Sequence, residues 1–161
     1  MRWLAETLAL IVAYVLIARF GLWMAAYMHP SISVIWPASG LALAALALFG
    51  RRLWPGILLG AFIANWIDLD WPVALLMAAG STLEAILAVW LLNRFDKFQS
   101  NLERVHDVIK LALFAAPIAS LVGAAVGVAT LALYGQLPEA RLIQAGWSWW
   151  LGDIIGFLLF A

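Results

Sequence analysis

The sequence contains no cysteine and few charged residues. The lack of cysteine excludes disulfide bonds, cysteine-ligated metals and thiol chemistry, although it does not identify the redox compartment. Charged residues make up 11% of the 161 residues, whereas a typical soluble domain has about 25%. The formal net charge is +0, so there is no basic field to hold nucleic acid. We therefore expect neither a soluble domain nor a nucleic-acid partner.

Apolar residues are correspondingly frequent in this sequence. They form 66% of the chain, the mean hydropathy is +1.02, and about 20 such residues cross a bilayer as a helix. No strand pattern is present. The sequence predicts an all-α, polytopic transmembrane bundle that forms one domain over residues 1–161. About six spans are expected, near residues 3–28, 33–49, 53–69, 72–92, 108–134 (bent at Pro117) and 143–161.

Basic residues are distributed unevenly about these spans. With the N-terminus inside, seven of the nine lie on the inner side and only Arg19 and Arg141 on the outer side. The positive-inside rule then predicts a bacterial inner-membrane protein with both termini on the cytoplasmic side. The seven inner residues are Arg2, Arg51, Arg52, Arg94, Lys97, Arg104 and Lys110. The last span stops at Ala161 without a polar flank, which suggests a piece of a longer chain.

Two acidic residues lie inside predicted spans, where ionisable groups are costly and usually face the bundle interior. Glu84 and Asp153 fall about 18 Å and about 15 Å from the outer ends of their helices at 1.5 Å per residue. They could therefore share a cavity, a proton or a cation. The alternative is structural, with each acid protonated or hydrogen-bonded to a neighbouring helix.

Tryptophan is unusually frequent, with ten residues in the chain. Trp149 and Trp150 precede Asp153 by four and three residues, so a helix brings them to its face. With Trp36 at the outer end of the second span, they predict an aromatic pocket for an apolar or cationic small ligand of unknown identity. An interfacial belt is the alternative, and we favour it for Trp3, Trp66, Trp71 and Trp147.

Small residues recur at the spacing that allows close packing of membrane helices. Asn65 in the third span could hydrogen-bond to another helix or contact a ligand. The glycines expected to pack helices together are Gly40, Gly56, Gly60, Gly123, Gly127, Gly152 and Gly156.

Histidine is missing from the predicted spans, because His29 and His106 lie in or beside loops. Ser39 in Pro37-Ala38-Ser39-Gly40 therefore has no obvious base, which argues against serine catalysis, although Ser39 stays a candidate ligand contact. The same lack argues against haem held by paired histidines. We expect no enzyme activity, no cofactor and no metal.

Several ordered segments resemble the first type of bacterial membrane-associated sensor domain, the MASE family. The longest is Ile35-Trp36-Pro37-Ala38-Ser39-Gly40-Leu41-Ala42-Leu43-Ala44. Further segments are Phe49-Gly50-Arg51-Arg52-Leu53-Trp54-Pro55-Gly56, Leu59-Gly60-Ala61-Phe62 with Asn65, Gly80-Ser81-Thr82-Leu83-Glu84-Ala85 and Trp149-Trp150-Leu151-Gly152-Asp153. Recurrent family positions are matched by Trp36, Pro37, Gly40, Trp54, Gly60, Asn65, Glu84, Trp150, Gly152 and Asp153.

The resemblance implies a membrane sensory input module. Such modules are fused to diguanylate cyclases, phosphodiesterases or sensor histidine kinases, so a cytoplasmic signalling output domain is the implied partner, and a homodimer remains open. The family commonly has about eight helices against six here, and many members have asparagine where this chain has Ser81. The alternative function is a small transport protein, such as the substrate-binding component of an energy-coupling-factor transporter.

Overall fold

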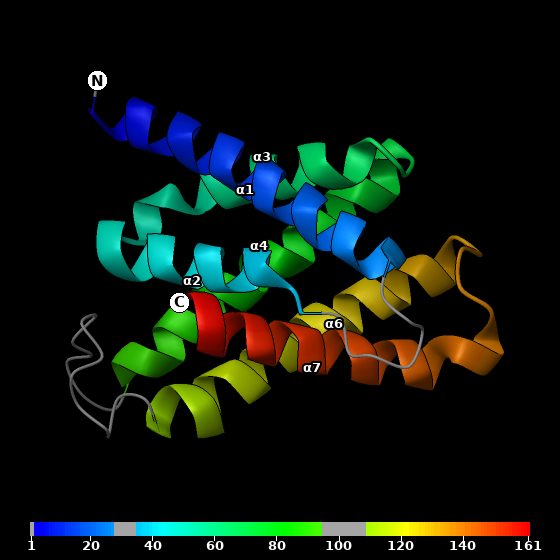
Figure 1. The fold of residues 1–161 in the computed structure, drawn as a ribbon. Coiled ribbons are helices and arrows are strands. Elements are labelled where there is room, and N and C mark those ends of the chain that lie inside the picture. The colour runs from blue at the N-terminus through cyan, green and yellow to red at the C-terminus, as the bar shows by residue number, and fades with distance from the viewer. Residues whose placement is uncertain (1, 28–34, 95–108) are drawn as a thin grey trace.

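The computed structural model describes residues 2–27, 35–94 and 109–161, and within them it contains helices and short connections without strands. The all-α bundle predicted from the sequence is therefore confirmed. Figure 1 shows the main helices, which are α1 (Arg2–Tyr27), α2 (Pro37–Phe49), α3 (Trp54–Trp66), α4 (Trp71–Arg94), α6 (Ala116–Leu133) and α7 (Leu142–Phe160).

Four helical segments are long and apolar enough to cross a membrane: Arg2–Ala25, Trp71–Arg94, Leu111–Leu133 and Glu139–Phe160. The helices α2 and α3 have 13 residues each, or about 20 Å at 1.5 Å per residue. The second and third helices are thus shorter than the spans predicted at 33–49 and 53–69. Pro37 and Pro55 each lie in the first turn of their helix, where a fixed φ and a missing N–H are tolerated.

The turn between α2 and α3 is tight. Gly50 has a φ of 96°, a left-handed conformation that suits glycine, and it ends α2. A single 3-10 turn, Arg51–Leu53, then leads into α3. This connection between the two short helices therefore carries two arginines at one end of the bundle.

The helices pack in a closed order around a core that is rich in alanine. Each helix packs on the next in the order α1, α3, α4, α6, α7 and α2, and α2 closes this order against α1. In addition, α2 contacts α4 across the middle. Alanine dominates the fully buried positions, as at Ala38, Ala61, Ala74, Ala78 and Ala116, because close approach of backbones drives helix association in lipid.

The backbone is irregular ahead of Pro117. A π-helical turn, Leu111–Ala115, precedes α6, and Pro117 lies in the first turn of α6. Trp150 Nε1 of α7 donates a hydrogen bond to the Pro117 carbonyl at 2.8 Å. A side chain of α7 thus hydrogen-bonds to the α6 backbone at the point where Pro117 interrupts the regular helical hydrogen bonds.

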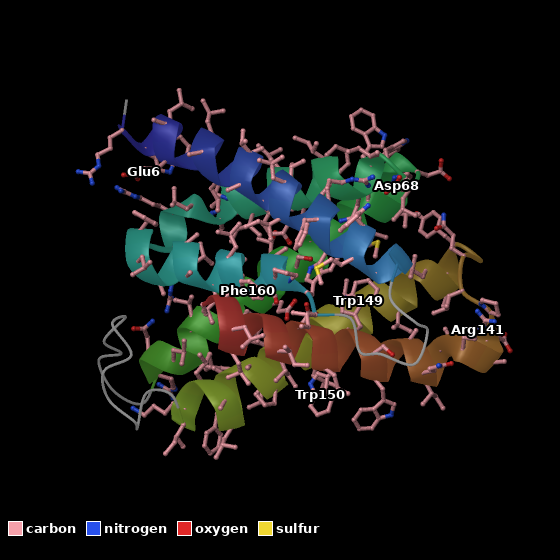
Figure 2. All side chains as sticks on the ribbon, viewed as in Figure 1. Glu6, Asp68, Arg141, Trp149, Trp150 and Phe160 are labelled. Carbon is pink, nitrogen blue, oxygen red and sulfur yellow. The ribbon has the colours of Figure 1, made fainter. Side chains whose placement is uncertain are left out.

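The ion-paired side chains lie at the two ends of the bundle, and both chain termini lie toward the same end (Figures 1 and 2). There, Glu6 of α1 accepts from Arg2 at 2.9 Å and from Arg52 at 3.1 Å. Asp68 and Arg141 lie at the opposite end (Figure 2), where Asp68 pairs with Arg19. These ion pairs join α1 to the ends of α3. Lys97 and Arg104 of the predicted inner side are outside the described residues.

A larger side chain at Gly60 should destabilise the contact between α3 and α1. A Cβ atom there would meet Tyr14 Cβ at 2.8 Å and the Ile11 carbonyl at 3.3 Å, so Gly60→Leu forces the two helices apart. We expect a loss of about 1–3 kcal/mol, the usual range for overpacking, measured as thermal stability in detergent and in lipid. Ala125→Leu at an exposed position of α6 is the control. Equal stability of the two variants would contradict this packing.

Candidate functional site

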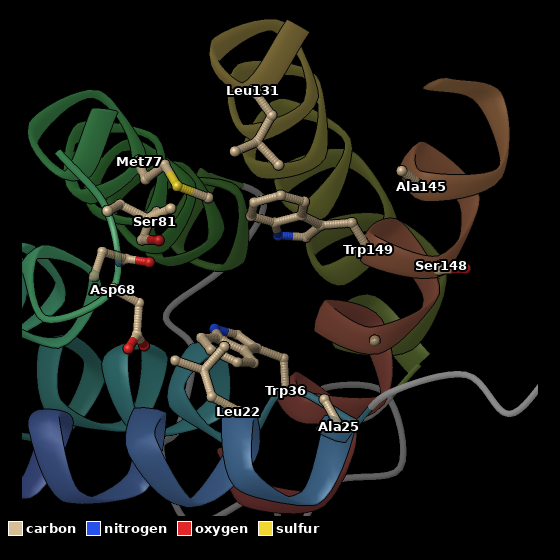
Figure 3. A pocket seen from close by; sticks show the side chains of 13 residues that line it. Leu22, Ala25, Trp36, Asp68, Met77, Ser81, Leu131, Ala145, Ser148 and Trp149 are labelled. Atoms are coloured by element: carbon tan, nitrogen blue, oxygen red, sulfur yellow. The ribbon is translucent and has the colours of Figure 1, made fainter. Parts of the chain in front are cut away.

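A cavity of about 400 Å³ opens among α1, the α3–α4 corner, α4, α6 and α7. Its walls are mostly apolar, from Leu22, Leu69, Met77 and Leu131, with Asp68 among the polar residues. Figure 3 shows the indole rings of Trp36 and Trp149 projecting into it from different elements. Asn65, Ser81, Ser148 and Gly152 complete the polar and backbone lining. The cavity lies toward the end of the bundle that holds Asp68 and Arg141 (Figure 2).

The two acids of the predicted spans lie just behind this cavity. Glu84 is 3% exposed and Asp153 is 1% exposed. Neither lines the cavity, but Ser81 lies one helical turn before Glu84, and Gly152 directly precedes Asp153. The two carboxyl groups interact electrostatically with each other. Within the described residues, Glu84 Oε1 and both carboxyl oxygens of Asp153 have no hydrogen-bond partner.

The start of α2 is held directly against the backbone of α7. The Trp36 N–H donates to the Gly152 carbonyl at 3.1 Å, and Ser39 Oγ contacts the Asp153 carbonyl at 3.2 Å and the Trp36 carbonyl at 2.8 Å. Gly40 and Gly156 face each other so closely that a Cβ on either would meet the backbone of the other helix. One wall of the cavity is therefore coupled to α7 through backbone contacts.

Two glycines of α6 make room for side chains of the site. A Cβ atom at Gly123 would overlap Glu84 Oε2, and one at Gly127 would overlap the ring of Trp149. These two glycines, predicted to pack helices together, thus lie against a carboxylate and an indole. The two glycines of α3, by contrast, pack against a neighbouring helix: Gly56 lies against Leu10 of α1, and Gly60 lies against Tyr14 of α1.

The structure separates the two tryptophans that the sequence places together. Trp149 lines the cavity near Asp153. Trp150 instead contacts Trp147 edge to face, with ring centroids 5.2 Å apart, and both line a separate groove of about 670 Å³ between α6 and α7. Asn65 lines the cavity while its amide donates to the Ala61 carbonyl in its own helix at 2.8 Å.

Sequence reasoning missed two polar residues of this region. Tyr14 of α1 is 2% exposed and its hydroxyl lies beside Ser81 and Trp36, within electrostatic range of both acids. Ser120 of α6 is fully buried and lies beside the Glu84 carboxyl. Each is a single polar residue within an apolar run of the sequence. That pattern could have identified them, because polar side chains within membrane spans tend to face the bundle interior.

The fold and the site define an integral membrane bundle with a partly open cavity, lined by two indole rings, next to a buried polar cluster. Comparison with known families identifies the chain more closely: it belongs to the MASE1 family, whose model matches residues 6–161. MASE1 domains are membrane sensory input domains, so the resemblance seen in the sequence is confirmed. Comparisons with curated proteins and with solved structures found no significant match.

Proposed function

We propose that residues 1–161 act as one sensory input unit in a bacterial inner membrane, with both termini cytoplasmic. A small ligand would bind in the cavity and bias the helix arrangement that an attached signalling domain reads. The cavity itself carries this proposal, since it places two indole rings above a pair of buried carboxyl groups. A well-formed apolar pocket with a few convergent polar groups is the usual form of a small-molecule site.

The chemistry of the walls favours an apolar ligand that carries a positive charge. Trp36 and Trp149 present aromatic rings, which attract cations through cation–π contact. Asp68 lies among the lining residues, and Glu84 and Asp153 lie behind the wall. Among the described basic residues, only Arg19 forms an ion pair with a residue that lines this cavity, and its partner is Asp68.

Trp36 offers a direct route for the signal. Its ring lines the cavity, while its backbone N–H is bonded to Gly152 of α7. A ligand that moves this ring therefore acts on the crossing of α2 and α7. Because α7 runs from the cavity to the end of the bundle where both termini lie (Figure 1), a shift of α7 would reach the cytoplasmic side in the proposed orientation.

Binding can be tested with a matched pair of probes, benzyltrimethylammonium and its neutral carbon isostere neopentylbenzene. We expect the cation to bind more tightly, seen as a saturable change in tryptophan fluorescence and a higher Tm. Trp149→Ala should weaken binding by roughly tenfold, since a cation–π contact is worth about 1–2 kcal/mol when desolvated. Trp147→Ala, two residues away in the separate groove, is the control. Equal losses in both variants, or tighter binding of the neutral probe, would contradict the proposal.

The proposed orientation predicts the location of two connections. Residue 70 follows the corner of α3 and α4 at the end that holds Asp68 and Arg141, so a reporter fused there should read as periplasmic. A reporter fused at residue 97 should read as cytoplasmic, because five described basic residues are on that side and positive residues are retained inside. The opposite reading at either residue would overturn the topology.

A further inference from the structure

Four buried oxygen atoms on α4, α6 and α7 have no hydrogen-bond partner in the described chain. They are Glu84 Oε1, Ser120 Oγ and both carboxyl oxygens of Asp153. Ser120 is 0% exposed and lies beside Glu84, so a hydroxyl with no partner adds to the two carboxyl groups. Buried polar groups are nearly always satisfied, and in lipid the cost of leaving them unsatisfied is several kcal/mol each.

No basic side chain of the described residues pairs with the two acids. The salt bridges within residues 2–27, 35–94 and 109–161 involve Glu6 and Asp68 at the helix ends. The other polar side chains that face the two acids are those of Tyr14, Ser39 and Trp149, and none of them carries a positive charge. In the described part of the chain, the two buried carboxyl groups therefore have no cationic partner.

The cluster is preformed and lies next to the cavity. Glu84 is packed against Gly123, where a Cβ would overlap the carboxylate, and Ser39 is fixed by contacts to two backbone carbonyls. Ser81 and Gly152, which flank the acids in the sequence, line the cavity. An ion that enters the cavity thus needs to pass only one layer of side chains.

We propose that Glu84, Asp153 and Ser120 bind one dehydrated alkali-metal cation. A proton satisfies one or two oxygens, whereas a cation satisfies several at once. Calcium takes 6–8 oxygen ligands, and magnesium keeps several waters, whereas one ionised carboxyl group is enough to balance the single charge of a monovalent ion. The second carboxyl then holds a proton, which leaves the site neutral, and Tyr14 is the other titratable group that faces the pair in the described part of the chain.

The cation joins three helices, so it should stabilise the folded protein. Thermal unfolding of the purified chain in detergent is measured while NaCl or KCl replaces N-methylglucamine chloride at constant ionic strength. We expect Tm to rise with the logarithm of the alkali-metal concentration, by on the order of 5 °C at about 100 times the Kd. Glu84→Gln, Asp153→Asn and Ser120→Ala should flatten this response. Asp70→Asn, an exposed acid outside the cluster, should retain it.

If a variant fails to fold, the Tm of the wild-type protein in the three salts is enough to test the proposal. A Tm that is the same in sodium, potassium and N-methylglucamine salts overturns the proposal. So does a Tm that responds to pH in N-methylglucamine but not to the alkali-metal ions, because the pair would then hold protons only. Retention of the cation response in Asp153→Asn also overturns it. The measurement uses neither benzyltrimethylammonium nor neopentylbenzene, so its failure leaves the ligand proposed for the cavity untouched.

Discussion

Gly156→Ala should unfold or strongly destabilise the bundle, although it adds a single methyl group. The new Cβ would overlap the Trp36 carbonyl and the Ser39 hydroxyl, and it would lie 2.9 Å from the Trp36 carbonyl carbon. Because most of these atoms belong to the backbone, they cannot turn aside as a flexible side chain can. We expect a loss of about 3 kcal/mol, the upper part of the overpacking range, measured as thermal stability in detergent.

A matched control lies on the same helix. A Cβ at Gly146 would have Val128 Cγ2 at 3.9 Å as its one near neighbour, so Gly146→Ala adds no clash and gains up to about 1 kcal/mol of helix propensity. The two variants should therefore shift Tm in opposite directions. If both behave alike, the close crossing of α2 and α7 is wrong, and with it the proposed route from the cavity to the chain end.

The second large effect concerns the two buried acids. With the domain joined to a signalling output domain, Glu84→Gln and Asp153→Asn should each change output, and the double variant should not equal their sum. Residues in contact show interaction energies of about 0.5–3 kcal/mol, and the two carboxyl groups interact electrostatically. Removal of one carboxylate changes the proton affinity of the other, so the second substitution acts on an altered site.

The measurement is a double-mutant cycle on output activity, with thermal stability as a second readout. Asp70→Asn combined with Asp153→Asn serves as the comparison, since Asp70 is exposed at the start of α4 and should combine additively with Asp153. Additive behaviour of Glu84 with Asp153 would show that the two acids have separate roles.

Much of the fold follows from composition and spacing alone. The shortage of charge and the long apolar runs favour a helical membrane bundle, because about 20 consecutive apolar residues cross a bilayer as a helix that satisfies its own backbone polar groups. Pro37 and Pro55 also start their helices where the sequence indicates, since a fixed φ acts locally. The predicted spans were longer than α2 and α3. At the end of α3, Ile67 and Leu69 are apolar but belong to a turn in which the Asp68 and Leu69 N–H groups bond to the Asn65 carbonyl.

The candidate site was only partly accessible to sequence reasoning. Similar depth on two helices placed Glu84 and Asp153 together, because the rise per residue is constant. Helical spacing also put Trp149 and Trp150 near Asp153, and yet their side chains line different cavities. The difference arises from rotation of α7 against α6, where Gly127 accepts one indole and Pro117 accepts the other.

The sequence by itself determined the class of protein, the helical architecture, the uneven charge and the place of two acids within apolar helices. Each of these depends on properties that a single chain segment carries, namely hydropathy, charge and local conformation. Tertiary structure alone decided that Tyr14 and Ser120 join the polar cluster, and that glycines accept a carboxylate and a ring. Those contacts join segments more than twenty residues apart, and they depend on how each helix is rotated about its axis, which close packing of the neighbouring helices sets.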